Sequence, residues 1–285
     1  MGKIPESELI LNKDGSVYHL NLLPKHLSDT IISVGDPSRV YKVSKYFDDL
    51  EFEMNRREFI THIGKYKGKR VTVISTGMGT DNIEIFFTEL DALANIDLKK
   101  REIKQRKKRL KIIRIGTSGA LQEDIPLGSH LVAENAVGLD TLMCFYNLPQ
   151  SEQERIIGSE IQEKISLPFT PYVVDCSKSL METVGFDMVS GNTITAPGFY
   201  GPQGRELRLG LKNPKLLSEL NYYNKDGFWL TNFEMETAGY YSMGRLLGHD
   251  VLSVNAIIAN RIRNKFSKNP EKVVDSLIRK VLDRI

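Results

Sequence analysis

Cysteine is nearly absent from this chain, which has only Cys144 and Cys176 among its 285 residues. Two cysteines are too few for a disulfide framework or a four-cysteine zinc site, so the sequence indicates a reducing compartment and a cytoplasmic protein. We expect both thiols to be buried as small hydrophobic groups rather than to act as nucleophiles.

A large charge of one sign and long apolar runs are also missing. The chain has 39 Lys and Arg against 36 Asp and Glu, a formal net charge of +3, far from that of a dedicated nucleic-acid binder. No run of about 18 apolar residues occurs, and charges interrupt the apolar patch within residues 1–16, so neither a membrane span nor a signal peptide is indicated. The hydrophobic fraction of 41% excludes disorder as the main state.

Apolar residues alternate between strand-like and helix-like spacing along the chain. The pattern predicts strands at residues 30–34, 59–66, 70–76, 112–116, 130–137, 171–175, 188–194 and 251–259. It predicts a helix from residue 82 onward and further helices at 236–247 and 270–285. Because no Pro- or Ser-rich linker and no internal repeat occurs, we expect one α/β domain over residues 1–285, a mixed sheet with helices on both faces.

Residues 99–111 (KKREIKQRKKRLK) form a strongly basic segment with a single Glu. Such a run is either an arm that binds nucleic acid or a solvated extension of the preceding helix. No aromatic residues are interleaved with the charges, as stacking on bases would require, so we favour the solvated helix extension on the surface. We therefore expect neither a nucleic acid nor a membrane as partner.

Two loops at the ends of predicted strands have residues suited to an anion. The segment GDPSR at 35–39 combines a glycine, which lets backbone N–H groups approach an anion, with a helix start at Pro37 and the guanidinium of Arg39. The segment RIGTSG at 114–119 offers N–H and hydroxyl donors at the end of another strand, where α/β sheets bind ligands. Gly-Asp-Pro is also an ordinary turn, so neither loop is decisive alone.

The glycine loops do not match the nucleotide-binding fingerprints. No Gly-Lys-Ser/Thr ends a Walker-type loop, and GMG at 77–79 lacks the third glycine of a dinucleotide loop. A third segment, NFEME at 232–236, places Glu234 and Glu236 where a helix begins, so they stay ionised and can accept hydrogen bonds from a pair of hydroxyls. This pair of carboxylates predicts a sugar ligand. The alternative is that the two residues only form a charged first turn of the helix and bind no ligand.

Together, five stretches resemble the nucleoside phosphorylases of the uridine and bacterial purine nucleoside phosphorylase superfamily. They are VGDPSRV, STGMG, RIGTSGALQ, FYGPQGR and NFEMETAG, in the order and spacing of that family, and the resemblance extends from about residue 19 to residue 259. It implies the family's phosphorylase fold and an enzyme that transfers a pentose from a nucleoside base to inorganic phosphate. No cofactor is implied, because phosphate is itself a substrate.

The resemblance also implies three groups of site residues. Those matching the phosphate site are Gly35, Arg39, Arg57, Arg114 and Thr117, with Arg57 contributed by the neighbouring subunit. Those matching the ribose site are Met235, Glu236, the adjacent Glu234, and His19, which would reach the 5′-hydroxyl across a subunit boundary. Those matching the base site are Phe199, Gln203 and Arg205, with Arg261 behind them. The catalytic residues would be Arg114, Gln203, Arg205 and Glu236.

Within the family, the base loop and Asn260 favour a pyrimidine nucleoside. Gln203 presents a donor and an acceptor to the uracil edge, Arg205 can donate to O4 as charge grows there, and Asn260 stands where purine enzymes have an Asp. We therefore expect reversible phosphorolysis of uridine to uracil and ribose 1-phosphate in pyrimidine nucleoside salvage. The alternatives are a purine nucleoside phosphorylase or nucleosidase of the same fold, and a nucleoside-binding or storage protein.

Residues 80–82 (TDN) depart from the Gly-Pro-Ser type of sequence with which some relatives bind a monovalent cation beside the acid matching Glu58. A potassium site near Glu58 is therefore not favoured, and no metal is expected. Because His19 and Arg57 would complete a neighbour's pocket, the resemblance implies a homo-oligomer, either a dimer or a hexamer built as a trimer of dimers.

Overall fold

Strand β1 (Thr30–Val34) shows how the apolar pattern builds the centre of the fold. It lies between two parallel strands, β4 (Lys69–Ser75) and β7 (Lys111–Ala120). Successive side chains point to opposite faces, so Ile31 joins one buried cluster and Ile32 joins another. The strand is apolar on both sides because both faces of the sheet are covered here.

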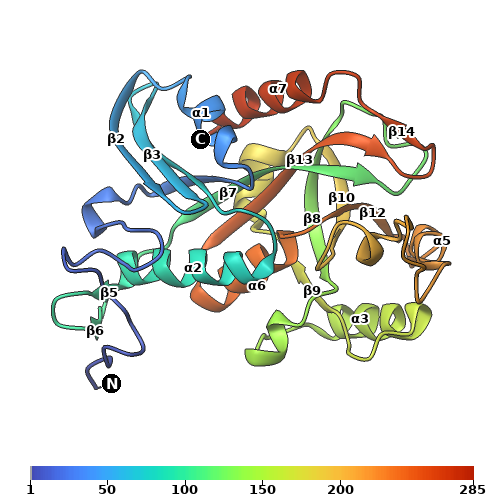
Figure 1. Cartoon of the computed structure of the whole chain (residues 1–285), viewed down its shortest axis with the longest axis horizontal. Helices are drawn as coiled ribbons and strands as arrows, with labels where there is room; N and C mark the ends of the chain where they lie inside the picture. The colour runs from blue at the N-terminus through green and yellow to red at the C-terminus, as the bar shows by residue number, and fades with distance from the viewer. Residues whose placement is uncertain (1) are drawn as a thin grey trace.

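The computed structural model describes residues 2–285 and confirms the mixed sheet predicted from the sequence (Figure 1). Its other strands are β2 (Asp49–Arg56), β3 (Phe59–Tyr66), β8 (His130–Gly138), β9 (Tyr172–Asp175), β10 (Val189–Thr195), β11 (Asn224–Lys225), β12 (Phe228–Glu234), β13 (Asp250–Asn260) and β14 (Lys265–Phe266). The strand order is β11-β12-β10-β8-β13-β7-β1-β4-β3-β2, with β9 paired to β8 and β14 to β13.

One extra pairing closes part of this sheet on itself. Strand β12 also pairs antiparallel with β7, opposite Gly119 and Ala120, so β12, β10, β8, β13 and β7 form a ring. The parallel strands β1, β4, β7 and β13 run side by side, and β8, β10 and β12 form a second parallel group. The loops after β1, β4, β10 and β12 supply the site described below.

Helices cover both faces of the sheet, as expected (Figure 1). On one face lie α1 (Pro37–Ser44) and α7 (Pro270–Leu282), and on the other lie α2 (Thr80–Asn95) and α6 (Thr237–Leu247). A third cluster is enclosed by α3 (Glu152–Ile165) and α5 (Leu216–Asn221) against β12. The short α4 (Lys178–Leu180) continues into a π-helical turn at Met181–Gly185.

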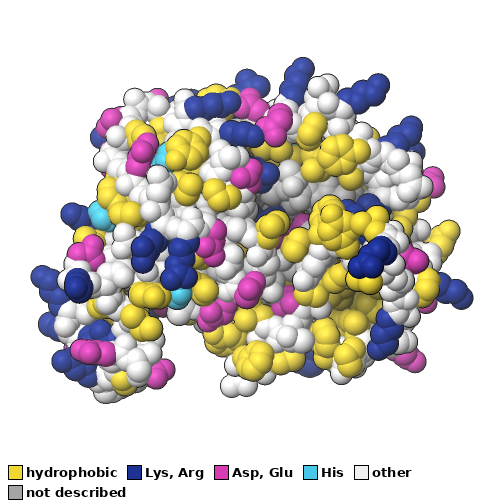
Figure 2. All heavy atoms as spheres, viewed as in Figure 1, with side chains coloured by type: hydrophobic (Ala, Val, Ile, Leu, Met, Phe, Trp, Pro, Cys, Tyr) yellow, Lys and Arg dark blue, Asp and Glu magenta, His cyan; other side chains and the backbone are white. Residues whose placement is uncertain are grey.

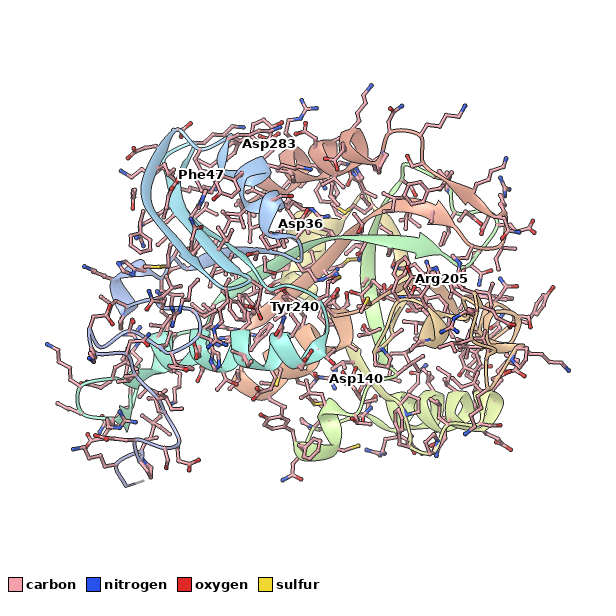
Figure 3. The ribbon with its side chains drawn as sticks, viewed as in Figure 1. Asp36, Phe47, Asp140, Arg205, Tyr240 and Asp283 are labelled. Atoms are coloured by element: carbon pink, nitrogen blue, oxygen red, sulfur yellow. The ribbon has the colours of Figure 1, made fainter. Side chains whose placement is uncertain are left out.

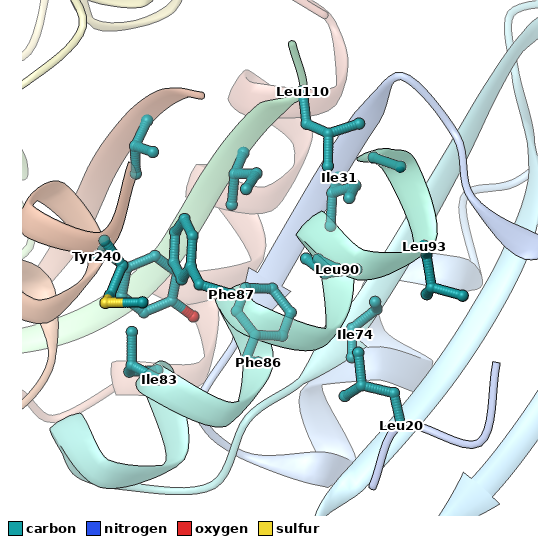
Figure 4. Packing of buried hydrophobic residues seen from close by; sticks show 14 of the residues in the cluster. Leu20, Ile31, Ile74, Ile83, Phe86, Phe87, Leu90, Leu93, Leu110 and Tyr240 are labelled. Carbon is teal, nitrogen blue, oxygen red and sulfur yellow. The ribbon is translucent and has the colours of Figure 1, made fainter. Parts of the chain in front are cut away.

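Helix α2 confirms the apolar stripe predicted for it. Phe86 and Phe87 are fully buried, and their ring centroids lie 5.9 and 5.3 Å from that of Tyr240 in α6 (Figure 4). Burying a side chain of this size contributes about 1.5–3 kcal/mol relative to leaving it exposed. Glu89 is the exception on this apolar face, a carboxylate residue that is only 8% exposed.

The basic segment 99–111 is not an extension of helix α2, so that prediction was wrong. The helix ends at Asn95, and β5 (Ile96–Asp97) pairs with β6 (Glu102–Ile103) in a small separate hairpin. The guanidinium of Arg101 donates to the carbonyls of Ile4 and Pro5 at 2.8 Å, and these contacts with the N-terminal segment favour the turn over a continued helix. The segment does lie on the surface, where Figure 2 shows Lys and Arg side chains gathered.

Within residues 2–285, none of the helices is both long and apolar enough to cross a lipid bilayer.

Candidate active site

A pocket of about 440 Å³ lies where the loops after β1, β4, β10 and β12 meet the ends of β7 and β13. Ten residues predicted from the sequence line it, and Asp36 and Arg205, labelled in Figure 3, mark two of its sides. The ten are Gly35, Arg39, Arg114, Thr117, Phe199, Gln203, Arg205, Glu234, Met235 and Glu236. The chain therefore brings most of the expected phosphate, ribose and base residues into one cavity.

Arg114 and two carboxylates form the buried floor of the pocket. The guanidinium Nη2 of Arg114, in β7, lies 2.5 Å from Glu236 Oε2 and 3.0 Å from Glu234 Oε2. The three residues are 4–5% exposed. Burial alone would lower the pKa of Arg114, but the charges of Glu234 and Glu236 outweigh it and raise that pKa above its ordinary value. The guanidinium is therefore charged under all ordinary conditions.

The two carboxylates have different surroundings. Glu234 accepts the backbone N–H groups of Glu236 and Thr237 at 3.0 and 2.9 Å and the hydroxyl of Thr195 at 2.6 Å. It thus fixes the chain where α6 begins. Burial raises the pKa of Glu236, Arg114 opposes that rise, and the charge of Glu234 adds to it.

Glu236 also connects the pocket floor to the glycine loop after β4. Its Oε1 accepts the N–H of Gly79 at 2.9 Å. Gly79 has φ +96°, a backbone conformation that favours glycine, which explains why this loop contains one there. Of the two carboxylates, Glu236 has fewer protein partners and is the one able to exchange a bond for a ligand hydroxyl.

The opposite wall has the features of an anion site. Asp36 caps helix α1 by accepting the Ser38 N–H at 2.9 Å, so the positive end of the helix faces the cavity. Arg39 donates to the Ile115 carbonyl at 3.2 Å, and burial together with the charge of Arg114 lowers its pKa. Two guanidiniums that repel one another in a half-closed cavity favour an anion between them.

The loop at residues 199–205, called the base loop because its sequence resembles the family's base site, holds its polar side chains through contacts within the loop. Arg205 donates through Nη1 to the Phe199 carbonyl at 2.5 Å and to Gln203 Oε1 at 2.6 Å, and its guanidinium lies 3.8 Å from the Phe199 ring centroid. Burial and the charge of Arg261 lower the pKa of Arg205 to about 10, so it is charged at neutral pH. Arg261 itself donates to the Gln203 carbonyl at 3.0 Å, behind the pocket.

Two predicted residues, His19 and Arg57, do not line the cavity of their own chain. They lie together elsewhere, because the Arg57 guanidinium is 5.7 Å from the Tyr18 ring centroid and the Tyr18 and His19 rings are 4.9 Å apart. Arg57 has φ +53°, which is uncommon for a residue with a Cβ, and this strained turn presents its side chain. Neither His19 nor Arg57 therefore contributes to the pocket of its own chain.

Two other residues considered in the sequence, Asn260 and Glu58, lie outside the cavity. Asn260 donates to the backbone carbonyls of Gln122 and Ile125 at 2.9 and 3.2 Å. The Glu58 side chain packs beside Gly77, 3.2 Å from where a Cβ would stand there. In residues 2–285, no group of three or more His, Cys, Asp or Glu side chains is arranged to hold a metal ion.

The burial predicted for the cysteines is correct for one of them only. Cys176 is half-buried, and burial raises the pKa of its thiol to about 12, so it is protonated at neutral pH. Cys144 is exposed instead, because it lies in the short 3₁₀ turn Leu142–Phe145, which has no buried residue.

Several lining residues were not predicted from the sequence. Phe233 and Met78 lie within the motifs NFEMETAG and STGMG but were not assigned a role, so the motifs themselves were a usable signal. Ile258 and Ala259 line the pocket from the end of β13, and Phe266 is brought beside them because β14 pairs with β13, with Ala259 opposite Phe266. These three residues and Phe199 are apolar parts of the lining.

Comparisons with known proteins agree with this geometry. Residues 29–282 match the model of the Phosphorylase superfamily. A uridine phosphorylase of Thermococcus kodakarensis is 29% identical over 276 residues, covering 95% of this chain and 87% of that protein. A DeoD-type purine nucleoside phosphorylase of Buchnera aphidicola is 28% identical over 237 residues, covering 83% of this chain and 82% of that protein.

Among solved structures, a Trypanosoma brucei nucleoside phosphorylase described as having uridine phosphorylase activity is similar to this chain with a TM-score of 0.87. It is 29% identical, and the match covers 97% of this chain and all of the other. A uridine phosphorylase of Phytophthora capsici, 22% identical with a TM-score of 0.70, shares the fold.

Proposed function

The chain belongs to the phosphorylase superfamily, and on that premise we propose that it is a uridine phosphorylase. As a pentosyltransferase it converts uridine and phosphate reversibly to uracil and ribose 1-phosphate, in cytoplasmic nucleoside salvage. The observation that supports this most is that one cavity contains the Arg39–Arg114 pair, the buried Glu236 and the Gln203–Arg205 pair. These are donors for an anion, an acceptor for hydroxyls and donors for a leaving base.

In the proposed mechanism, phosphate is the nucleophile and the protein supplies charge and position. Arg39, Arg114, Thr117 and the Gly35 N–H hold phosphate, with Arg57 from a neighbouring subunit. Bidentate guanidinium contacts fix the attacking oxygen near C1′ of the ribose. No covalent nucleophile of the protein is needed, in keeping with an exposed Cys144 and a protonated Cys176 that both lie outside the cavity.

The ribose lies over Met235 and Glu236, and His19 of a neighbouring subunit contacts its 5′-hydroxyl. Glu236 accepts ribose hydroxyls by exchanging its present bonds, while Glu234 keeps the start of α6 in place. As the bond from C1′ to the base breaks, the sugar gains positive charge beside these carboxylates. The two carboxylates stabilise this positive charge on the sugar.

The base stacks on Phe199 and its edge meets Gln203 and Arg205. Negative charge grows on the departing uracil, so the donors of Arg205 bind more strongly in the transition state than in the substrate. The bonds of Asn260 to backbone carbonyls leave it no role in protonating a purine, which supports the pyrimidine substrate. No cofactor is required, and no cation beside Glu58 is part of this proposal.

A purine nucleoside phosphorylase is the second candidate, favoured by the similarity to DeoD-type enzymes. Purified protein would be given uridine, thymidine, inosine or adenosine, with and without phosphate, and base release would be measured. We expect uracil release from uridine that depends on phosphate. Strong inosine cleavage without uridine cleavage would contradict the pyrimidine assignment.

We also propose a homo-oligomer, at least a dimer, in which His19 and Arg57 complete a neighbour's pocket. Their distance from their own chain's cavity lining supports this. Inactive Arg57→Ala chains mixed with inactive Glu236→Ala chains should regain partial activity, because a mixed dimer has one intact pocket and one with both defects. A mixture that stays inactive despite demonstrated subunit exchange, or a fully active monomer, would contradict shared sites.

A further inference from the structure

Glu89 is a buried acid that no step of the mechanism above uses. It lies on the otherwise apolar face of α2 and is 8% exposed. Its Oε1 accepts the backbone N–H of His19 at 2.9 Å, and its Oε2 accepts that of Leu20 at 2.8 Å. Burying a carboxylate is costly unless it is well hydrogen-bonded, so these contacts explain how the fold tolerates it.

The same carboxylate also contacts the ring of His19. The Nδ1 atom of His19 lies 2.7 Å from Glu89 Oε1. A carboxylate only accepts hydrogen bonds, and its two oxygens also accept backbone N–H groups here, so Nδ1 of His19 is the donor in this contact. Anchoring the backbone alone would not need this third bond. The contact therefore sets the tautomer of the ring, with the hydrogen on Nδ1.

The other ring nitrogen is free for a ligand. Nε2 of His19 makes no hydrogen bond to any group in residues 2–285, and the side chain is 29% exposed. Tyr18 packs edge-on against the ring, with centroids 4.9 Å apart, and Arg57 lies over Tyr18. These contacts limit the ring's rotation, and Nε2 is not enclosed by protein atoms. His19 and Arg57, the two residues assigned to a neighbour's pocket, both contact Tyr18.

We propose that Glu89 is a positioning residue for His19, because it holds the Nδ1–H tautomer and so presents Nε2 to the 5′-hydroxyl of the nucleoside in the neighbouring subunit's pocket. The inference rests on the proposed function, in which His19 contacts that hydroxyl. Glu89 itself touches no substrate. Its effect is to make the enzyme select nucleosides that have a 5′-hydroxyl.

The test compares uridine with 5′-deoxyuridine, which lacks that hydroxyl, in the full-length oligomeric enzyme. The readout is the ratio of their kcat/KM values, which a loss of protein stability alone would not change. We expect the wild-type ratio to favour uridine about tenfold or more, as one lost hydrogen bond to a ring nitrogen predicts. His19→Ala should bring the ratio close to one, and Glu89→Gln should lower it to nearly the same value.

Glu154→Gln is the matched control. The side chain of Glu154 is 12% exposed and that of Glu89 is 11% exposed. Like Glu89, Glu154 accepts a backbone N–H, that of Ser151 at 2.7 Å, and it contacts a second side chain, the guanidinium of Arg245, at 2.7 Å. It lies outside the pocket lining, so Glu154→Gln should keep the wild-type ratio. A comparable fall in this control would mean that loss of any buried carboxylate loosens the site, and that result would overturn the inference.

A second measurement uses the wild-type protein alone, so it does not depend on whether a variant folds. The ¹⁵N chemical shifts of the His19 ring in the wild-type enzyme, taken where the imidazole is neutral, should report the Nδ1–H tautomer. An Nε2–H tautomer would overturn the inference.

The outcomes also separate this inference from the proposed function. A wild-type enzyme that releases no uracil in the presence of phosphate would contradict both. An active wild type in which His19→Ala lowers the ratio while Glu89→Gln retains it would overturn the role of Glu89 alone.

Discussion

The cluster around Arg114 and the loop that ends at Arg205 line the same pocket but are held in different ways. Arg114 connects strand β7 to Glu234 at the end of β12 and to Glu236, and all three side chains are buried. In the loop, Phe199 is 51% exposed, and both side-chain hydrogen bonds of Arg205 stay within the loop. Arg261 adds one contact from outside.

We infer from this difference that the two regions have different roles in the proposed enzyme. The end that we propose for sugar and phosphate is formed by strand β7 and by residues at or next to strand ends, so it exists before substrate binds and contributes to the stability of the fold. The base end is formed by a partly exposed loop, so its order contributes to turnover more than to folding. Substitutions in the two regions should therefore affect different measurements.

The largest effect is expected for Arg114→Ala. Removing this guanidinium leaves Glu234 and Glu236 buried side by side without a counter-charge, which should cost about 3–5 kcal/mol of unfolding free energy as well as activity. Urea denaturation of the variant measures this loss. Arg39→Ala is the control, since Arg39 lines the same pocket but within residues 2–285 its side chain makes a hydrogen bond only to the Ile115 carbonyl and no ion pair, so it should lose activity with little change in stability. Equal stabilities for the two variants would mean that the cluster is not structural.

Arg205→Ala should show the reverse pattern. We expect kcat for uridine to fall about a hundredfold or more, because this donor meets charge that develops in the transition state, while the unfolding midpoint stays the same. Steady-state kinetics and a thermal melt test both parts. The neighbouring Arg208 provides the control Arg208→Ala: it lines an adjoining cavity, which Arg205 also lines, but it is absent from the lining of the proposed site, so turnover should stay near normal. A nearly normal kcat for Arg205→Ala would remove Arg205 from the site.

A smaller effect is expected for Phe199→Ala. Stacking of a base on an aromatic ring is worth about 1–3 kcal/mol, so KM for uridine should rise about tenfold or more. Tyr222→Ala removes an aromatic side chain that is exposed but outside the pocket, and KM should not change. The assignment of Phe199 to the base would be contradicted if both variants had the same KM.

The smallest effect is expected for Cys144→Ser, which belongs to neither region. Its thiol is exposed and outside the pocket lining, so turnover should change less than about twofold, as for an ordinary surface substitution. Progress curves before and after treatment with a thiol-alkylating reagent extend the same test to the wild type. A large loss in the Ser variant would indicate a thiol function.

The local part of the fold and site could be predicted from the sequence. Strand β1 and the hairpin of β3 and β4 have the predicted bounds to within about one residue, because their apolar patterns are strong. The pocket motifs were recognisable because Gly35 directly follows β1 and Glu234 ends β12. The loop predicted at 114–119 was wrong, since β7 continues through these residues to Ala120, where it pairs with β12 and β13. A functional residue beside the end of a strand can be predicted from the few residues around it in the sequence.

The rest depends on contacts between distant segments. The edge strand β2 was missed although Leu50, Phe52 and Met54 alternate there with Glu51 and Glu53, a pattern that predicts a strand with one apolar face. Strand β12 was also missed, although Glu234 ends it. Phe266 enters the pocket through a strand pairing, and Glu89 meets His19 across 70 positions of sequence. The turn at Arg101, which ends the expected helix, is likewise fixed by contacts with Ile4 and Pro5. No local pattern reports such pairings.

The most direct test of the proposed function is ³¹P NMR of the enzyme with uridine and inorganic phosphate. The account predicts that the phosphate resonance is replaced by that of a sugar 1-phosphate ester, in step with the release of uracil. Release of uracil with free ribose and an unchanged phosphate resonance would show hydrolysis instead, and no release of uracil would contradict the account altogether.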